Sequence, residues 1–302
     1  DVKGWRDAAG FLALAIVWGS GYPAIRAAVQ GIDPLFLAAV RFDLIGVIVM
    51  AYVIASGRQW WPARGDWGSI LVGGGLLIAL HNGLLFVAQT LISSAMGAVI
   101  ISTVPILSVA FAIPRLPDAR PTPVRVLGIL LGLVGVGIIA SPPPGALTSP
   151  DPVGVGIMFL SAAVFAFASV EIRHRRTDLP VTSLQAWMML VGGPLLHVGS
   201  LVVGETQALA YRTDVLVGFV YLVLVAGVVG YLLYFTLLDS LGPVEINLVG
   251  YVEPPVAAVV GWVALNEVIS PNTVVGFAAI VVGFTLVKRQ ALAAFVQGLR
   301  GP

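Results

Sequence analysis

Cysteine is absent from this chain of 302 residues, which excludes disulfide bonds, thiolate catalysis and cysteine-based metal sites. Histidine is scarce as well, because the chain has only His81, His174 and His197, which lie far apart in the sequence. The sequence contains neither an HExxH nor a GxSxG pattern, which mark zinc peptidases and serine hydrolases. A membrane-embedded enzyme therefore finds little support, and we expect no bound metal and no cofactor.

Charged residues are also rare, at 10%, whereas hydrophobic residues make up 58% of the chain. These proportions, arranged in apolar runs of about 20 residues, are typical of proteins in a lipid bilayer. Because Trp18, Tyr22 and Pro23 interrupt the first run, we expect it to be a span and not a cleaved signal peptide. The sequence predicts ten spanning helices, at residues 9–29, 34–56, 67–89, 91–113, 124–140, 152–172, 182–204, 214–238, 243–264 and 271–287.

The few cations predict how the chain is oriented. Thirteen of the 16 Lys and Arg residues fall on one side of the ten spans, and the opposite side has only Arg26 and Arg212, while Arg41 lies within the second span. Since positive residues collect on the cytoplasmic side of a membrane protein, we expect both termini in the cytoplasm. The chain has no basic patch of useful size, so we expect no nucleic-acid partner.

The two halves of the chain repeat each other at an offset of about 147 positions. Pro34 and Gly46 correspond to Pro180 and Gly192, and the run TPVRVLGILLGLVGVGI aligns with SPNTVVGFAAIVVGFTL. Because each half holds five spans, the second copy enters the membrane from the other side. We therefore predict an all-α membrane protein of ten transmembrane helices. They form two inverted five-helix repeats, residues 1–145 and 146–302, as in secondary transporters.

Several of these segments resemble the EamA-type branch of the drug/metabolite transporter superfamily. They are AIVWGSGYPAIRAA, PLFLAAVRF, VPILSVAFAIPRL and LGPVEINLVGYVEPPVAAVVGWVALNEVISPNTVVGFAAIVVGF. The resemblance implies alternating access and metabolite export across a bacterial cytoplasmic (inner) membrane, and the chain is most similar to the YddG-type aromatic amino-acid exporters. The family tends to carry an acidic residue before the Ser/Thr-Pro that opens the last helix of each repeat. Glu267 matches this pattern, whereas Ala119 takes the place in the first half, with Asp118 beside it.

Polar side chains within the spans are costly in hydrocarbon and normally face the bundle interior or water. His81 and Asn82, in the third span, either bond a neighbouring helix or bind the polar head group of a substrate. Glu253, at mid-depth of the ninth span, needs a partner, and Arg41 is the nearest candidate by depth. The alternatives for Glu253 are a site for a substrate amine or a proton, and a protonated, hydrogen-bonded acid.

Proline and glycine predict which helices move and which pack. Proline kinks a helix, and Pro105 in the fourth span corresponds in place to Pro254 and Pro255 in the ninth, as a rocking gate requires. The fifth and tenth spans are aliphatic and rich in glycine, which lets helices approach closely in lipid. We expect these two spans to hold the repeats together, outside a central cavity lined by helices 1, 3, 4, 6, 8 and 9. The glycines concerned include Gly128, Gly132, Gly276 and Gly283.

Aromatic side chains predict the walls of that cavity. Tyr and Trp away from the interface need a hydrogen-bond partner, and several of them fall on the helices expected to line the cavity. The candidates are Trp18, Tyr22, Phe86, Phe165, Tyr231 and Tyr234. We expect a small-molecule substrate, most simply an aromatic or other apolar amino acid, with membrane lipid around the protein and a monomer possible. An exporter of drugs or lipophilic cations is the alternative, while a channel lacks a filter sequence.

Overall fold

A computed structural model describes residues 2–114, 122–141, 151–175, 177–209, 212–241 and 249–299, and these ranges contain helices and no strand. The first half contains α1 (Val2–Gly19), α2 (Gly21–Ala28), α3 (Pro34–Ala55), α4 (Trp67–Val72), the π-helix η1 (Gly73–Leu80), α5 (His81–Ala88), α6 (Ser94–Ile101), α7 (Val104–Ala112) and α8 (Pro123–Ala140). The second half contains α9 (Pro152–Arg175), α10 (Val181–Val202), α11 (Thr213–Val220), the π-helix η2 (Tyr221–Val229), α12 (Gly230–Leu241), α14 (Val249–Leu265) and α15 (Pro271–Leu299).

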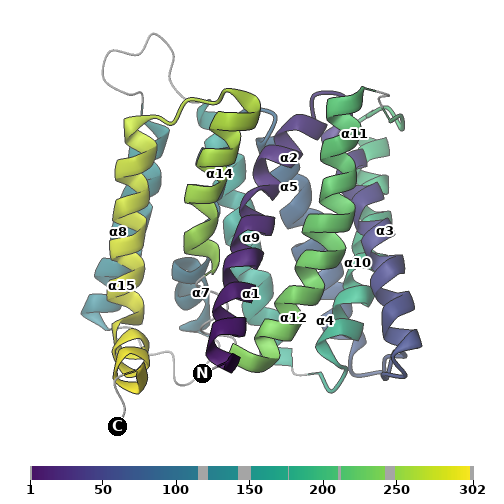
Figure 1. Cartoon of the computed structure of the whole chain (residues 1–302), viewed down its shortest axis with the longest axis horizontal. Helices are drawn as coiled ribbons and strands as arrows, with labels where there is room; N and C mark the ends of the chain where they lie inside the picture. Colours follow the sequence, from purple (N-terminus) through teal and green to yellow (C-terminus); the bar gives the residue numbers. More distant parts are fainter. Residues whose placement is uncertain are drawn as a thin grey trace.

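These elements confirm a protein built to span a membrane several times. Seven helical segments in the described ranges are long and apolar enough to cross a bilayer, and three shorter apolar ones lie at Val126–Ile139, Val249–Leu265 and Pro271–Leu286. Together they occupy the places of the ten predicted spans. The predicted first residues of the ninth span, 243–248, and the predicted repeat boundary at 145/146 lie outside the described residues. Since α1 begins and α15 ends at the same end of the bundle, we call the opposite end the distal end (Figure 1).

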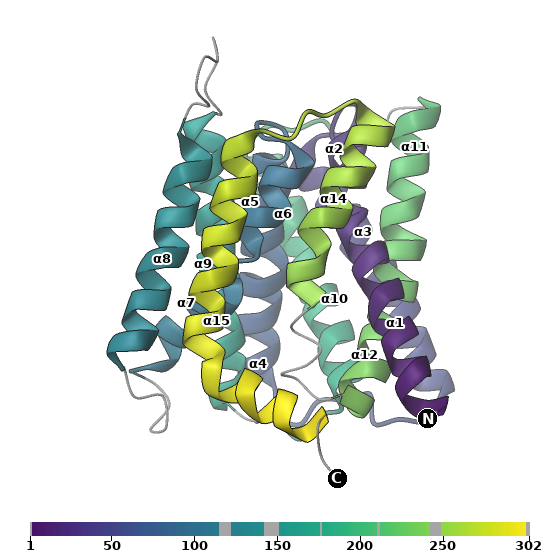
Figure 2. The same ribbon diagram turned by 60° about the vertical axis from the view of Figure 1, so that its left-hand side comes forward.

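The helices of the last span in each half lie side by side at one edge of the bundle (Figures 1 and 2). Gly276 of α15 lies against Gly135 of α8 so closely that an added Cβ would be 2.6 Å from the carbonyl oxygen of Gly135. Farther along, a Cβ on Gly283 would be 2.6 Å from the carbonyl oxygen of Gly128. Because residue numbers rise in one helix as they fall in the other, α8 and α15 are antiparallel, with glycine allowing the backbones to touch.

The second helices of the two halves form another antiparallel pair. Gly46 of α3 packs against Met189 and Leu190 of α10, and Gly193 of α10 packs against Asp43 of α3. Corresponding helices that run in opposite directions are what an inverted repeat requires, so the geometry of both pairs agrees with the inverted relation predicted from the sequence.

Both halves also interrupt the third of their five spans with a π-helix. The π-helices η1 and η2 begin at Gly73 and Tyr221, which are equivalent positions in the two repeats. Each packs against the second helix of the other half. An added Cβ on Gly73 would lie 2.5 Å from the Met188 side chain of α10, and one on Gly227 would lie 2.4 Å from Ile45 of α3. A π-helix has wider turns than an α-helix and often marks a functional site.

The first and fourth spans are broken as well. The chain turns at Ser20 between α1 and α2, and at Ser102 and Thr103 between α6 and α7. Pro105 falls in the first turn of α7, where its missing N–H costs no helical hydrogen bond. Pro254 and Pro255 instead lie inside α14, which continues through them. These prolines therefore sit in helices 4 and 9 as predicted, and their role in gating stays a prediction.

Candidate functional site

Three of the predicted aromatic residues come together between the first and eighth spans. The ring of Trp18 stacks on Tyr234 with centroids 5.2 Å apart, and it meets Tyr231 edge-on at 5.8 Å. The Trp18 indole N–H donates a hydrogen bond to the carbonyl of Ala226 at 3.1 Å. Gly230 makes room for the indole, since an added Cβ there would be 2.5 Å from Trp18 Nε1. We call Trp18, Tyr231 and Tyr234 the aromatic wall.

The π-helix η2 organises this region through its carbonyl groups. One of them, at Ala226, accepts the indole N–H of Trp18, and another, at Leu222, accepts a hydrogen bond of 3.3 Å from Nε of Arg41. In the first half the Asn82 amide likewise donates to the carbonyl of Leu77 in η1, at 3.0 Å. In both halves a side-chain donor therefore uses a backbone acceptor in the π-helical turns. Asn82 bonds its own helix, which leaves its predicted contact with substrate untested.

Glu253 is buried and paired with Tyr22. The two side chains lie close enough to interact electrostatically, between α2 and α14. The helices cross closely here, because an added Cβ on Gly19 would be 2.8 Å from the carbonyl oxygen of Glu253. Gly19 directly follows Trp18 in the chain, so this part of α14 lies beside the aromatic wall. Figures 1 and 2 show α1, α2 and α14 next to one another.

Arg41 is buried too, but its surroundings differ from the prediction. Its guanidinium carbon lies 5.0 Å from the centroid of the Phe42 ring and 5.7 Å from that of Phe86. It also interacts electrostatically with Tyr231. The Arg41–Glu253 ion pair suggested by depth is not formed between these two described residues. The reason is that equal depth fixes one coordinate only, and the two side chains leave their helices toward different neighbours.

His81 belongs to a separate cluster between the third and sixth spans. Its Nδ1 shares a hydrogen bond of 2.8 Å with Ser161 Oγ, which also donates to the His81 carbonyl at 2.8 Å. The Phe165 ring meets the imidazole edge-on at 4.9 Å. The structure thus brings His81 and Phe165 together. The hydrogen bonds with Ser161 give His81 a structural role, and its role in substrate binding stays a prediction.

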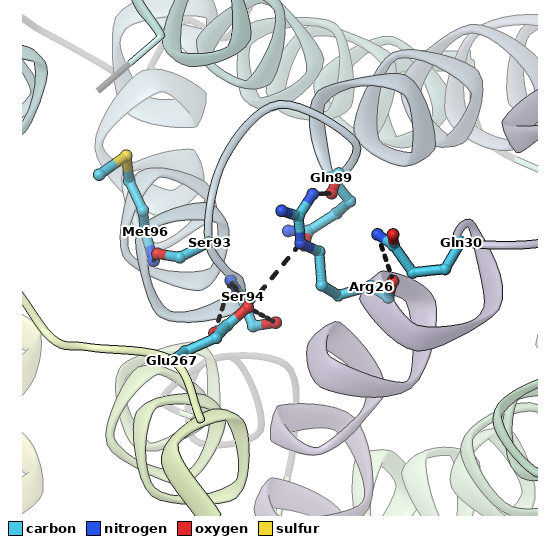
Figure 3. Close-up of polar contacts among 7 residues, drawn as sticks. All are labelled: Arg26, Gln30, Gln89, Ser93, Ser94, Met96 and Glu267. Atoms are coloured by element: carbon cyan, nitrogen blue, oxygen red, sulfur yellow. Dashed lines mark hydrogen bonds and ion pairs between the residues drawn. The ribbon is translucent and has the colours of Figure 1, made fainter. Parts of the chain in front are cut away.

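A polar junction joins the two halves at the distal end. Glu267, which follows α14, accepts hydrogen bonds from the N–H of Ser94, at 3.1 and 3.2 Å, and from its hydroxyl at 3.1 Å. Nε of Arg26 lies 4.0 Å from Glu267 Oε1, and Nη1 of Arg26 donates to the carbonyl of Gln89 at 2.5 Å. Figure 3 shows these side chains converging from α2, the residue after α5, the start of α6 and the segment after α14. We call Arg26, Gln89, Ser94 and Glu267 the distal junction.

Local structure explains why Glu267 reaches this place. Asn266 adopts a left-handed conformation with φ of 53°, which asparagine tolerates better than most residues. The turn lets the Glu267 N–H bond the carbonyl of Gly261 at 3.1 Å. Gly261 also leaves space for the carboxylate, since an added Cβ would lie 2.5 Å from Glu267 Oε2. The carboxylate then sits at the N-terminus of α6, where the helix dipole favours a negative charge.

Sequence reasoning found only parts of the distal junction. Glu267 matches a family pattern, whereas the sequence alone identifies Arg26 only as a cation on the outer side. The one available signal was charge complementarity between these two residues, which are 241 positions apart. Arg26, Gln89 and Ser94 come from the first half and Glu267 from the second. The distal junction therefore fastens one half to the other at this end.

Known proteins share this architecture over nearly the whole chain. The model of the EamA-like transporter family matches twice, at residues 7–141 and 152–289. The uncharacterized inner membrane transporter YedA of Escherichia coli is 30% identical over 277 residues, covering 91% of this chain and 88% of its own. A probable terminal-alkyne amino-acid exporter of Streptantibioticus cattleyicolor is 28% identical over 287 residues, covering 93% of each chain.

A solved crystal structure has the same fold, with a TM-score of 0.64 and 20% identity over 96% of this chain and 98% of its own. The family model matches both five-helix halves, and the chain has the apolar helices of a multi-pass membrane protein. The chain therefore belongs to the EamA-like transporter family, within the drug/metabolite transporter superfamily, and its activity is membrane transport.

Proposed function

We propose that the protein exports apolar amino acids, above all aromatic ones, across a bacterial cytoplasmic membrane. The observation that carries the proposal is the aromatic wall placed next to the Tyr22–Glu253 pair. The wall offers apolar contact to a flat side chain. Glu253 is buried and carries the acidic group that a substrate amine needs, because an unpaired charge leaving water costs several kcal/mol.

Apolar contact discriminates weakly between substrates, by about 1–3 kcal/mol per methylene. We therefore expect a preference for a class of amino acids and not for one compound. The similarity to a probable terminal-alkyne amino-acid exporter supports a substrate with an α-amino acid head group. The alternative is export of drugs or lipophilic cations, which an acid beside aromatic rings would also suit.

The proposed mechanism is alternating access between the two halves, with both termini in the cytoplasm and the distal junction on the extracytoplasmic side. The distal junction consists of a small number of polar contacts between the halves, which have to separate for this end to open. The broken helices and the prolines of helices 4 and 9 are places where the backbone can bend. The α8–α15 pair, with its touching backbones, suits the fixed part about which the halves rock.

Counterflow in proteoliposomes tests the proposal. Labelled phenylalanine should exchange with internal phenylalanine or tryptophan, more slowly with leucine, and not with glutamate. Trp18→Ala should slow phenylalanine exchange by about three- to tenfold, the equivalent of one lost aromatic contact. Trp262→Ala is the matched control, because Trp262 is 63% exposed on α14. Exchange of tetraphenylphosphonium without exchange of any amino acid would favour the alternative function.

A further inference from the structure

Arg41 uses only a small part of its hydrogen-bonding capacity. A guanidinium group carries five N–H donors, and the structure gives Nε one acceptor, the carbonyl of Leu222 at 3.3 Å. Among the described residues, Nη1 and Nη2 have no acceptor. Both of these nitrogens keep some exposed surface, so neither is fully enclosed by the protein. Arg41 is nevertheless 9% exposed as a whole residue.

The acids nearest to Arg41 in sequence and in depth are engaged elsewhere. Asp43 is two residues away on α3 and bonds His197 Nε2 at 2.9 Å, on the side of the helix that faces α10. Glu253 lies beside Tyr22 and forms no ion pair with Arg41. The compensation that Arg41 does receive comes from the rings of Phe42 and Phe86 and from one carbonyl. A buried cation in a membrane protein without a bonded acid is an expensive arrangement, and such groups usually mark a substrate pathway.

The position of Arg41 connects it to the site proposed above. Arg41 bonds the carbonyl of Leu222, and Trp18 of the aromatic wall bonds the carbonyl of Ala226, four residues farther along the same π-helix η2. The guanidinium and the wall therefore share one supporting helix. A planar guanidinium binds a carboxylate through two parallel hydrogen bonds, which a lysine cannot reproduce.

We propose that Nη1 and Nη2 of Arg41 bind the carboxylate of the transported molecule, so that the substrate is a monocarboxylate whose apolar side chain lies on the aromatic wall. This assignment rests on the proposed function and specifies which group of the protein recognises the carboxylate. It differs from the structural role that the sequence predicts for Arg41.

The test uses two probes, each of which carries the aromatic ring and only one of the two polar groups of an amino acid. The probe 3-phenylpropanoate has the ring and the carboxylate but no amine, and phenethylamine has the ring and the amine but no carboxylate. Binding of each is measured by thermal stabilisation of the purified full-length chain. Arg41→Gln should weaken binding of 3-phenylpropanoate by about tenfold or more, the loss of a charge-assisted hydrogen-bonded contact, and leave phenethylamine binding within twofold.

Two further variants control for folding and for net charge. Arg41→Lys keeps the charge and should weaken the binding of 3-phenylpropanoate less than Arg41→Gln does. Arg58→Gln changes an exposed position and should bind both probes as the wild type does. If Arg41→Gln does not give a monodisperse protein, weaker binding of 3-phenylpropanoate by Arg41→Lys than by the wild type, with phenethylamine binding retained, supports the assignment. Three results would overturn the assignment. The Arg41 variants could lose binding of both probes equally, they could bind 3-phenylpropanoate as the wild type does, or the wild type itself could fail to bind 3-phenylpropanoate.

These outcomes are independent of whether amino acids are transported. If the wild type exchanges phenylalanine and Arg41→Gln binds 3-phenylpropanoate normally, the carboxylate assignment fails and the proposed function stands. If the wild type exchanges no amino acid but 3-phenylpropanoate binding depends on Arg41, the amino-acid proposal fails and the carboxylate site stands.

Discussion

Removing the charge of Glu267 should open the distal end of the protein. Glu267→Gln keeps the size of the side chain but replaces the charged acceptor of the Ser94 N–H and hydroxyl with a neutral one. Hydrogen bonds to a charged group contribute about 1.5–3 kcal/mol, compared with about 1 kcal/mol for neutral ones. The Arg26 ion pair, at 4.0 Å and with side chains 28% and 13% exposed, adds at most about 1 kcal/mol after solvent screening. The closed state should therefore lose about 2 kcal/mol, a shift of about 30-fold toward the open state.

Thiol labelling can measure this shift directly, because the chain has no native cysteine. Ala98→Cys places a single thiol one turn inward from Ser94 on α6, at a position that is 2% exposed. A membrane-impermeant thiol reagent added to intact cells should label this cysteine about 30-fold faster in the Glu267→Gln background. That estimate holds if labelling follows the population of the open state.

A matched control removes a carboxylate that caps a helix without joining the halves. Asp151 accepts hydrogen bonds from the N–H groups of Val153 and Gly154, at 2.8 and 3.3 Å, at the start of its own helix α9. Asp151→Asn should leave labelling of Ala98→Cys unchanged. Equal labelling rates in the wild-type and Glu267→Gln backgrounds, or an equal increase caused by Asp151→Asn, would refute the idea that the distal junction holds this end closed.

The remaining predictions concern packing and the two polar clusters. Gly276→Ala should lower stability by about 1–3 kcal/mol, seen as a lower unfolding temperature in detergent, because the new Cβ would meet the backbone of α8; Gly137→Ala, in open space, should not. His81→Ala should slow phenylalanine counterflow more than Ser161→Ala does, and unchanged counterflow in a folded His81→Ala protein would leave the residue with a structural role. Trp18→Phe should raise the KM of exchange about fivefold, because it loses the hydrogen bond of about 1 kcal/mol between the indole N–H and the Ala226 carbonyl. An unchanged KM would show that this hydrogen bond does not contribute to substrate binding.

The sequence predicted the fold well because membrane helices follow simple physical rules. A run of about 20 apolar residues suffices to place a span, so α3 and α10 begin and end within two residues of the predicted limits. The glycine series at a steady offset predicted the close α8–α15 pair and the inverted repeat. These features depend on composition and periodicity, which are visible in one dimension.

The geometry of the site was less accessible from sequence. The π-helices η1 and η2 have apolar sequences without a distinctive signal, although they supply the acceptors for Asn82, Trp18 and Arg41. Residue type and depth correctly drew attention to the buried charges, but they do not give the direction in which each side chain leaves its helix. For that reason Arg41 and Glu253 were paired in the prediction, whereas the structure engages them with different partners.

The central claim is that one site for apolar amino acids is opened alternately at the two ends of the protein. It is tested most directly by counterflow of labelled phenylalanine through a transporter whose distal junction is covalently closed. Cysteines introduced by Ser94→Cys and Glu267→Cys, in this cysteine-free chain, can be joined by a short, cleavable bifunctional thiol reagent. We expect exchange before cross-linking, loss of exchange after it, and recovery when the linker is cleaved. Undiminished phenylalanine exchange through the fully cross-linked protein would show that the distal end does not open during transport.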